Sequence, residues 1–480
     1  MYFIGIDIGI HETVVARTPG YNSSPISVIP LELNNGIKTT VLKTALNKSN
    51  DMYSLLSKED FEALKFEDRD QTSTLLEGFI KATEDMTPID KESMIVFTKL
   101  LLQTIMESDH DLNDNNYIIG ITCRHCFNNL SYIDFLKKEC KLYNCIFIDD
   151  LYAAKYMQHK TYADYKNILV INIDPIAVDF KSYLDSEICD KNSYNVNYGF
   201  DKVYNTLKHM ILSYGDNKRN IQYLIHQSQT PLQCIVERKI ESLIEEKIRG
   251  YYQCRFENLE FSIRYAELLP IWSGDESDIC VKFYLSKNEL NELTINYHLG
   301  LCDILTNIYT KLALANSKPD KVMLIGEYCN IDFIQSSISK IFNVPISEHY
   351  KIEYEVAMGI AYYVHDMYHA KENLQVVIQN KIKNFGILSV TDEKSLQHLY
   401  KFIVGCINDE LNIFNEHCKT DEKDILNAIF RLLTHSLCLD MYEWNTHFRN
   451  NLISKAMEIF ESNLPHAIYS PELQYSIYKF

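Results

Sequence analysis

The sequence predicts an α/β protein with two similar halves, followed by an all-α segment. Apolar strand patterns alternate with amphipathic helix patterns from residue 2 to about residue 370, which is typical of sheets covered by helices. Residues 3–17 and 168–184 share one pattern: an apolar strand, a polar residue at its end, a turn and a second strand. Beyond residue 372 glycine almost disappears, and helical patterns cover 396–414, 425–437 and 442–460.

In the first half, β-branched and apolar runs predict strands, and a 3.6-residue spacing of apolar side chains predicts helices. The clearest helix carries an apolar stripe of Met94, Phe97, Leu101 and Ile105. The expected strands are 2–9, 13–17, 118–123 and 145–148, and the expected helices are 89–108, 130–142 and 151–159. Residues 50–90 are polar and poorly periodic.

The second half repeats the alternation. Ser286 and Glu289 fit a capping box at the start of a long helix over 290–315. The other expected helices are 203–213, 232–249, 331–342 and 356–370, and the expected strands are 168–173, 178–184, 255–269, 279–284 and 321–325. These patterns divide the chain into residues 1–165, 166–370 and 373–480.

Composition excludes several function classes. Of 480 residues, 46% are hydrophobic and 23% are charged, which is typical of globular proteins. The net charge of −18 argues against a nucleic-acid partner, because phosphate backbones bind basic faces. No run of about 18 apolar residues predicts a membrane span. Thirteen cysteines, an odd number spread over the chain, favour reduced thiols and a cytoplasmic protein.

Six segments in order resemble the nucleotide-binding domain of the DnaK-type (seventy-kilodalton heat-shock) chaperones, within the actin–hexokinase superfamily. IGIDIGI (4–10) resembles the family's GIDLGTT, and LVINIDPIAVDF (169–180) lies where DLGGGTFD is expected. Residues 117–154 resemble the stretch from ITVPAYFND to NEPTAA. The remaining three segments are NYGFDKVYNTL (197–207), KVMLIGEYCNI (321–331) and EYEVAMGIA (353–361).

The resemblance implies a two-lobed actin-like ATPase fold, with duplicated RNase H-like cores around a central cleft that holds ATP or ADP with Mg. It implies that Asp7 holds the metal through water and that Asp150 and Asp179 act in catalysis. Lys81 is the nearest candidate for the family's phosphate-side lysine. The residues implied at the nucleotide are Gly9, His11, Asn172, Gly326, Glu327 and Gly359.

Departures from the family pattern weaken this site. Ile10 and His11 replace two threonines, and Asn172 replaces a carboxylate near the metal. The glycine triplet of the second hairpin is Asp174-Pro175-Ile176, Ala177 replaces a threonine, and Glu327 replaces a glycine on the nucleoside side. We therefore expect weak ATP binding and little hydrolysis in a chaperone-like or regulatory protein. The alternative is a pseudo-ATPase scaffold that binds no nucleotide.

Four cysteines have a spacing that resembles a zinc site. Cys123 and Cys126 precede the helix expected at 130–142, whereas Cys140 and Cys145 follow most of it. A helix of about 12 residues rises about 18 Å, so the two pairs lie too far apart for one ion. We expect free thiols and no structural zinc.

The family's chaperones continue into a β-sandwich that binds peptides, but residues 373–480 lack alternating strand patterns. We therefore expect an independent helical module that binds a protein partner, and a chain ending near residue 370 that still folds. The oligomeric state is not determined by these patterns.

Overall fold

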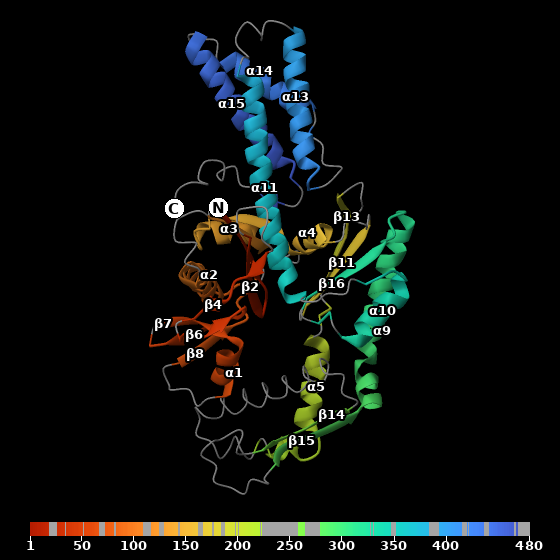
Figure 1. Ribbon diagram of the computed structural model, residues 1–480. Helices are drawn as coiled ribbons and strands as arrows, with labels where there is room; N and C mark the ends of the chain where they lie inside the picture. Colours follow the sequence, from red (N-terminus) through yellow and green to blue (C-terminus); the bar gives the residue numbers. More distant parts are fainter. Residues whose placement is uncertain are drawn as a thin grey trace.

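The computed structural model describes the chain in segments. Excluded from the description are 19–25, 34, 51, 67–72, 81–82, 109–116, 124–128, 143–144, 162–166, 175–176, 184–187, 197, 200, 221, 223–257, 265–278, 327, 330, 347–351, 384–392, 415–419, 421, 436–440, 465–466 and 469–480. Figure 1 shows a body of two sheets with their helices, and a helical tail that stands above it.

The first sheet, called here the large sheet, has nine strands among the described residues. In its centre β1 (Tyr2–Ile8) forms an antiparallel hairpin with β2 (Glu12–Thr18) and pairs in parallel with β9 (Tyr117–Cys123). The outer strands are β10 (Ile146–Asp149), β17 (Ala467–Ile468), β3 (Ser27–Val28), β6 (Val41–Ser49), β7 (Met52–Ser57) and β8 (Ser73–Glu77). The polar, poorly periodic segment 50–90 thus holds β7, α1 (Lys58–Phe66) and β8.

The second sheet has the order β13-β12-β11-β16. Here β11 (Ile168–Ile173) forms an antiparallel hairpin with β12 (Val178–Tyr183) and pairs in parallel with β16 (Lys321–Ile325), as β1 does with β2 and β9. Its edge strand is β13 (Ile188–Val196). Two small antiparallel pairs complete the strands: β14 (Asn258–Arg264) with β15 (Ile279–Ser286), and β4 (Leu31–Glu32) with β5 (Lys38–Thr39).

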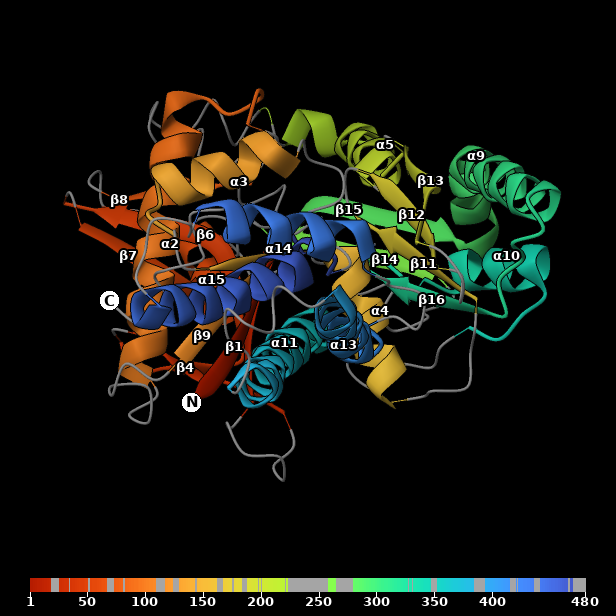
Figure 2. The ribbon, with the colours of Figure 1, turned by 90° about the horizontal axis from the view of Figure 1, so that it is seen from above.

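Helices cover the outer face of each sheet (Figure 2). The apolar stripe of Met94, Phe97, Leu101 and Ile105 lies on α2 (Pro88–Ser108) and is fully buried, as the spacing predicted. With α3 (Asn129–Lys138) it packs on the large sheet. The second sheet is covered by α5 (Asp201–Ser213), α9 (Lys287–Leu314) and α10 (Asp332–Phe342). The capping box of Ser286 and Glu289 is present at the start of α9. The helix expected at 232–249 lies outside the described residues.

Between the two sheets lie α4 (Asp150–Thr161) and α11 (Ile352–Ile382). One continuous apolar core joins Phe3 and Ile148 of the large sheet, Val170 and Met323 of the second sheet, and both helices. The core continues upward into α13 (Glu393–Leu411), α14 (Glu422–His435) and α15 (Met441–Ser462). None of the described helices is long and apolar enough to cross a membrane.

The expected boundaries at residues 370 and 373 both fall inside α11, which continues unbroken to Ile382. Its first half packs on the large sheet and α4, and its second half packs on the tail helices through Leu374 and Ile378. The strand β17, which follows α15, pairs with β10 of the large sheet. The tail therefore shares its core with the body, whereas the sequence led us to expect an independent module.

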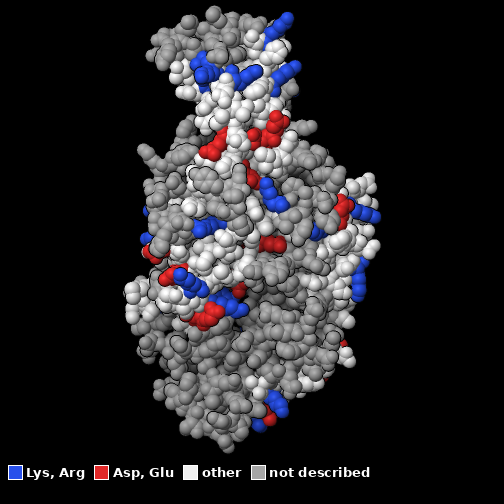
Figure 3. Space-filling view, viewed as in Figure 1, with Lys and Arg blue, Asp and Glu red and all other residues white. Residues whose placement is uncertain are grey.

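The visible face of the tail has separated charges. Lys and Arg side chains gather on its upper part, away from the body, and Asp and Glu side chains lie nearer its base (Figure 3).

A chain that ends at residue 370 should unfold at a lower temperature than the full chain, because it lacks part of the shared core. It loses Leu374, Ile378, Phe414 and Phe460 from the shared core. Each large apolar side chain contributes about 1.5–3 kcal/mol when fully buried. Thermal unfolding followed by circular dichroism tests this, with a chain ending at Leu464 as the matched control. Equal melting temperatures for the chain ending at 370 and the full chain would contradict the shared core.

Candidate functional site

The carboxyl ends of the central parallel strands bring Asp7 and Asp150 to the same edge of the large sheet. Asp7 is the penultimate residue of β1, and Asp150 begins α4 directly after β10. The strand β9 lies between them, and the Ile8 N–H donates to Thr122 Oγ1 at 2.9 Å, which ties the ends of β1 and β9 together. The Asp150 carboxylate is buried and accepts from the Leu151 N–H at 2.9 Å.

The second sheet places Asn172, Asp174 and Asp179 together. Asn172 and Asp179 are paired across β11 and β12, and Asn172 Nδ2 donates to Asp174 Oδ2 at 3.1 Å. All three side chains are buried. An aspartate at position 172 would add a third buried carboxylate, and like charges at such distances raise each other's cost of ionisation. The amide at position 172 avoids this repulsion and donates to Asp174 instead.

Gly326 directly follows β16 and lies beside Asn172 and Ile173. Its φ of 94° lies in the left-handed region, which favours glycine. A Cβ at this position would lie 2.3 Å from Asn172 Oδ1 and 2.6 Å from the Ile173 carbonyl oxygen. Asn172 Oδ1 is buried and makes no hydrogen bond within the described part of the chain. The structure thus brings Asn172, Asp174, Asp179 and Gly326 into one group.

The two hairpin turns are equivalent, and both are closed by their own backbone. The Gly9 N–H donates to the Glu12 carbonyl at 2.9 Å, and the Asp174 N–H donates to the Ala177 carbonyl at 3.0 Å. His11 lies in the first turn, and its carbonyl accepts from the Thr44 N–H at 2.9 Å. The N–H of Gly9, a residue that the family resemblance places at the nucleotide, is thus used to close the turn.

A buried ion pair between the two sheets was missed at the sequence level. Lys181 of β12 lies 3.3 Å from Asp149 Oδ2 at the end of β10, and both side chains are at most 6% exposed. Asp149 Oδ1 also accepts from the Tyr152 N–H at 2.9 Å and so caps the start of α4. Lysine inside a buried strand, two residues after Asp179, is the signal that could have identified this pair.

Gly359 lies in a helix crossing. It is buried on α11 where that helix meets α4, and a Cβ there would lie 1.9 Å from the Ala153 carbonyl oxygen. The close packing of these two helices by itself requires glycine at position 359. Gly5 plays the same part on β1, where a Cβ would lie 2.1 Å from the Ala357 carbonyl oxygen.

Two of the expected site residues, Lys81 and Glu327, lie outside the described residues, as does Cys126. Burial raises the pKa of Cys140 and of Cys145 to about 12, so both are protonated thiols at neutral pH. Among the described side chains, no group of three His, Cys, Asp or Glu residues could hold a metal ion.

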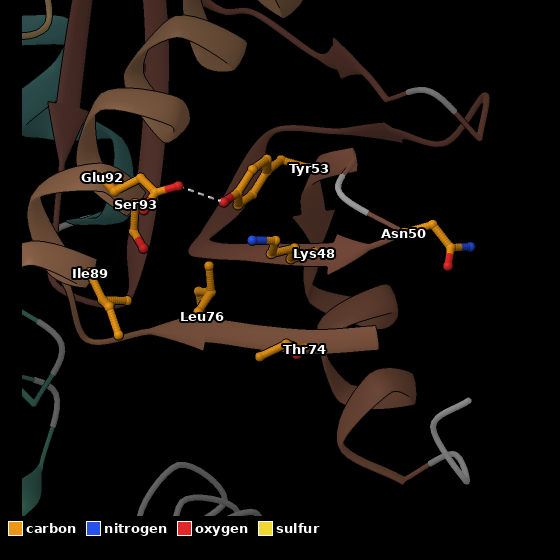
Figure 4. A pocket seen from close by; sticks show the side chains of 8 residues that line it. All are labelled: Lys48, Asn50, Tyr53, Thr74, Leu76, Ile89, Glu92 and Ser93. Atoms are coloured by element: carbon orange, nitrogen blue, oxygen red, sulfur yellow. Dashed lines mark hydrogen bonds between the residues drawn. The ribbon is translucent and has the colours of Figure 1, made fainter. Parts of the chain in front are cut away.

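Two hollows lined by described residues lie away from the junction of the sheets. The larger, of about 470 Å³, lies between α2 and strands β6, β7 and β8. Tyr53 and Glu92 join across it by a 3.0 Å hydrogen bond, and Lys48 lies beside Tyr53 (Figure 4). The smaller lies between α2, Leu33 and Leu55.

Comparison with solved structures identifies the fold. MreB 5 of Spiroplasma citri bound to AMPPNP matches this chain with a TM-score of 0.52 and 13% identity. The match covers 78% of this chain and 98% of MreB 5. The fold is that of the actin-like ATPases. No protein-family model matches the chain, and no curated protein matches it in sequence.

Within this actin-like fold, Lys181→Met should lower the free energy of unfolding by about 3–5 kcal/mol, because it leaves the Asp149 carboxylate buried without its counter-charge. Adding Asp149→Asn should recover part of the loss. Lys43→Met is the matched control, because its partner Glu12 is 30% exposed and water can solvate it. Urea unfolding measures all four chains, and an equal loss for Lys181→Met and Lys43→Met would contradict the buried pair.

Replacing either of two helical glycines by alanine should change the stability of the protein, in opposite directions. Gly359→Ala forces α11 and α4 apart and should destabilise the protein by about 1–3 kcal/mol. Gly405→Ala, on α13, meets no atom within 4 Å and should stabilise it by up to about 1 kcal/mol through helix propensity. Differential scanning calorimetry of both variants tests the crossing, which a neutral Gly359→Ala would disprove.

Proposed function

We propose that this protein is a pseudo-ATPase scaffold of actin-like fold that hydrolyses ATP no faster than background. The observation that carries the proposal is the pair of hairpin turns. In each turn the first N–H closes the turn itself, and in the second turn Asp174 places a buried carboxylate where an anion would approach. Anion sites in proteins need free backbone donors and a positive local field.

The duplicated hairpins support a two-lobed origin for the scaffold. β1-β2-β9 and β11-β12-β16 have the same pairing, one antiparallel and one parallel. In this interpretation the large sheet and the second sheet are the two lobes, and Asp7 and Asn172 are equivalent strand-end residues. The shared core and the Asp149–Lys181 pair then hold the lobes in one arrangement.

A second candidate is weak, magnesium-dependent nucleotide binding. The fold is shared with a protein that was solved with AMPPNP bound. Asp7 and Asp150 at one sheet edge could hold a hydrated magnesium ion, since carboxylates and water are the ligands that this ion prefers. The ion would also offset the repulsion between these carboxylates and a triphosphate.

The helical tail supports action through a protein partner. Among the described residues from Ile352 to Ser462 only helices occur, so a peptide-binding β-sandwich of the chaperone type has no counterpart there. A chaperone-like or regulatory role would therefore use the tail surface. The described cysteines are free, which fits the proposed cytoplasmic location.

Steady-state ATP turnover should be indistinguishable from background, because the Gly9 and Asp174 N–H groups close their own turns and the buried Asp174 carboxylate repels a phosphoryl group. Phosphate release measured with excess Mg tests this. Asp7→Ala should leave the rate unchanged, as should the exposed control Asp216→Ala. Robust turnover that is lost only in Asp7→Ala would overturn the pseudo-ATPase proposal.

Calorimetric titration with ATP distinguishes the two candidates. The scaffold gives no heat of binding, whereas the second candidate gives weak binding with Mg that disappears when EDTA is added. Tight binding without Mg would contradict both candidates.

A further inference from the structure

The helices α11 and α13 pack on each other in the tail, and their outward sides are together called here the tail face. On α11 the core positions Leu374, Ile378 and Ile382 point inward. Val376 and Val377 between them are 55% and 41% exposed. Apolar side chains on an outer helix face favour a contact that covers them.

The charges of the tail face are ordered along both helices. Lys383 at the end of α11 and Lys401 on α13 are exposed on the upper part, and Glu372 and Asp409 are exposed nearer the body. Figure 3 shows basic side chains on the upper part of the tail and acidic side chains nearer the body. Glu372 is held in place by a hydrogen bond of 2.7 Å from the Tyr368 hydroxyl.

The two helices run antiparallel, and their charge patterns have the same midpoint. The Lys381 ammonium lies 4.8 Å from the centre of the Phe402 ring, which sets the level of one helix against the other. Gly405 follows Phe402 by three residues on α13, and Ile378 precedes Lys381 by three residues on α11. Because the helices run in opposite directions, Gly405 and Ile378 lie at the same level. Gly405 is midway between Lys401 and Asp409, and Ile378 lies next to the midpoint of Glu372 and Lys383.

No contact within the described chain explains why position 405 is a glycine. A Cβ there would meet no atom within 4 Å, so no neighbour requires glycine. Glycine in the interior of a helix is unfavourable relative to alanine. Gly405 is half-buried, and a glycine at such a position allows the backbone of a second helix to approach closely.

We propose that the tail face binds the tail face of a second copy of this chain, in an antiparallel C2 dimer. The two-fold axis runs across the helices at the level of Gly405. It sets Lys401 against the partner's Asp409 and Glu372 against the partner's Lys383, and it covers Val376 and Val377. The inference rests on the proposal that the tail is the interaction surface, and it does not depend on nucleotide.

A self-complementary face fits a second copy better than a partner of one charge. An acidic partner would meet Glu372 and Asp409, and a basic partner would meet Lys383 and Lys401. A reversed copy matches both ends at once, as an isologous interface requires. Opposite charges across an interface fix its register and exclude wrong partners.

Sedimentation velocity over a concentration series tests the dimer with charge-swapped full-length chains. Lys401→Glu and Asp409→Lys should each weaken dimerisation by more than about tenfold, because like charges then face each other. The double variant Lys401→Glu/Asp409→Lys restores opposite charges across the axis and should return the dissociation constant to the wild-type value. Lys383→Glu with Glu372→Lys is a second, independent swap.

Lys340→Glu on α10, an exposed lysine outside the tail, makes the same charge change and should leave the dimer unaffected. Gly405→Gln should keep or raise the melting temperature and yet weaken the dimer by more than about tenfold, which separates loss of contact from loss of fold. A wild-type chain that stays monomeric, or a double swap that fails to restore the dimer, would overturn the inference.

Phosphate release measured on the same samples distinguishes a failure of the dimer proposal from a failure of the pseudo-ATPase proposal. A dimer with robust ATP turnover would overturn the pseudo-ATPase and leave the tail face as assigned. A monomer with background turnover would overturn the dimer alone.

Discussion

The crossing of α11 over α4 at Gly359 is the contact on which the rest of the structure depends. The Gly359 Cα lies against the Ala153 carbonyl, so the two helices meet backbone to backbone. On its other side α11 lies against β1 at Gly5 in the same way. These two close approaches fix α11 between the sheet and the helix, and its continuation to Ile382 carries the tail helices with it.

Polar side chains also join α4 and α11, and their directional contacts fix the position of one helix along the other. The Tyr156 hydroxyl donates to Asp366 Oδ2 at 2.5 Å, and Lys160 pairs with the same carboxylate at 2.6 Å. Burial alone would raise the pKa of Asp366, but the hydrogen bond from His365 and the charge of Lys160 bring it below its ordinary value. Because the pKa of Asp366 is lower in the folded protein than in the unfolded chain, the ionised carboxylate stabilises the fold at pH values above the unfolded pKa. This stabilisation is lost as the pH falls through the pKa of the folded protein.

The sequence was sufficient for the local elements and for the fold class, and insufficient for how the parts join. The α2 stripe and the Ser286 capping box were readable because their periodicity and spacing are local. The boundary near residue 372 was wrong because α11 does not end there. The loss of glycine marks the point where α11 stops packing on the sheet and α4 and begins to pack on the tail helices. Gly359 was interpreted through a family motif, although a glycine in a helix serves equally well where two backbones meet.

The site shows the same limit at the level of single side chains. Asp7, Asp150, Asn172 and Asp179 were identified through the family resemblance, and the structure places them where β1, β10 and β11 end and β12 begins. Lys181 was missed because its partner Asp149 is 32 residues away and on another sheet. A buried charge pair of this kind contributes little net stability over an apolar pair, but it penalises any arrangement that separates the charges. The pair therefore acts chiefly on the orientation of the second sheet against α4. A fixed orientation supports the proposed scaffold role, because it opposes the opening and closing by which an enzyme of two lobes exchanges its nucleotide.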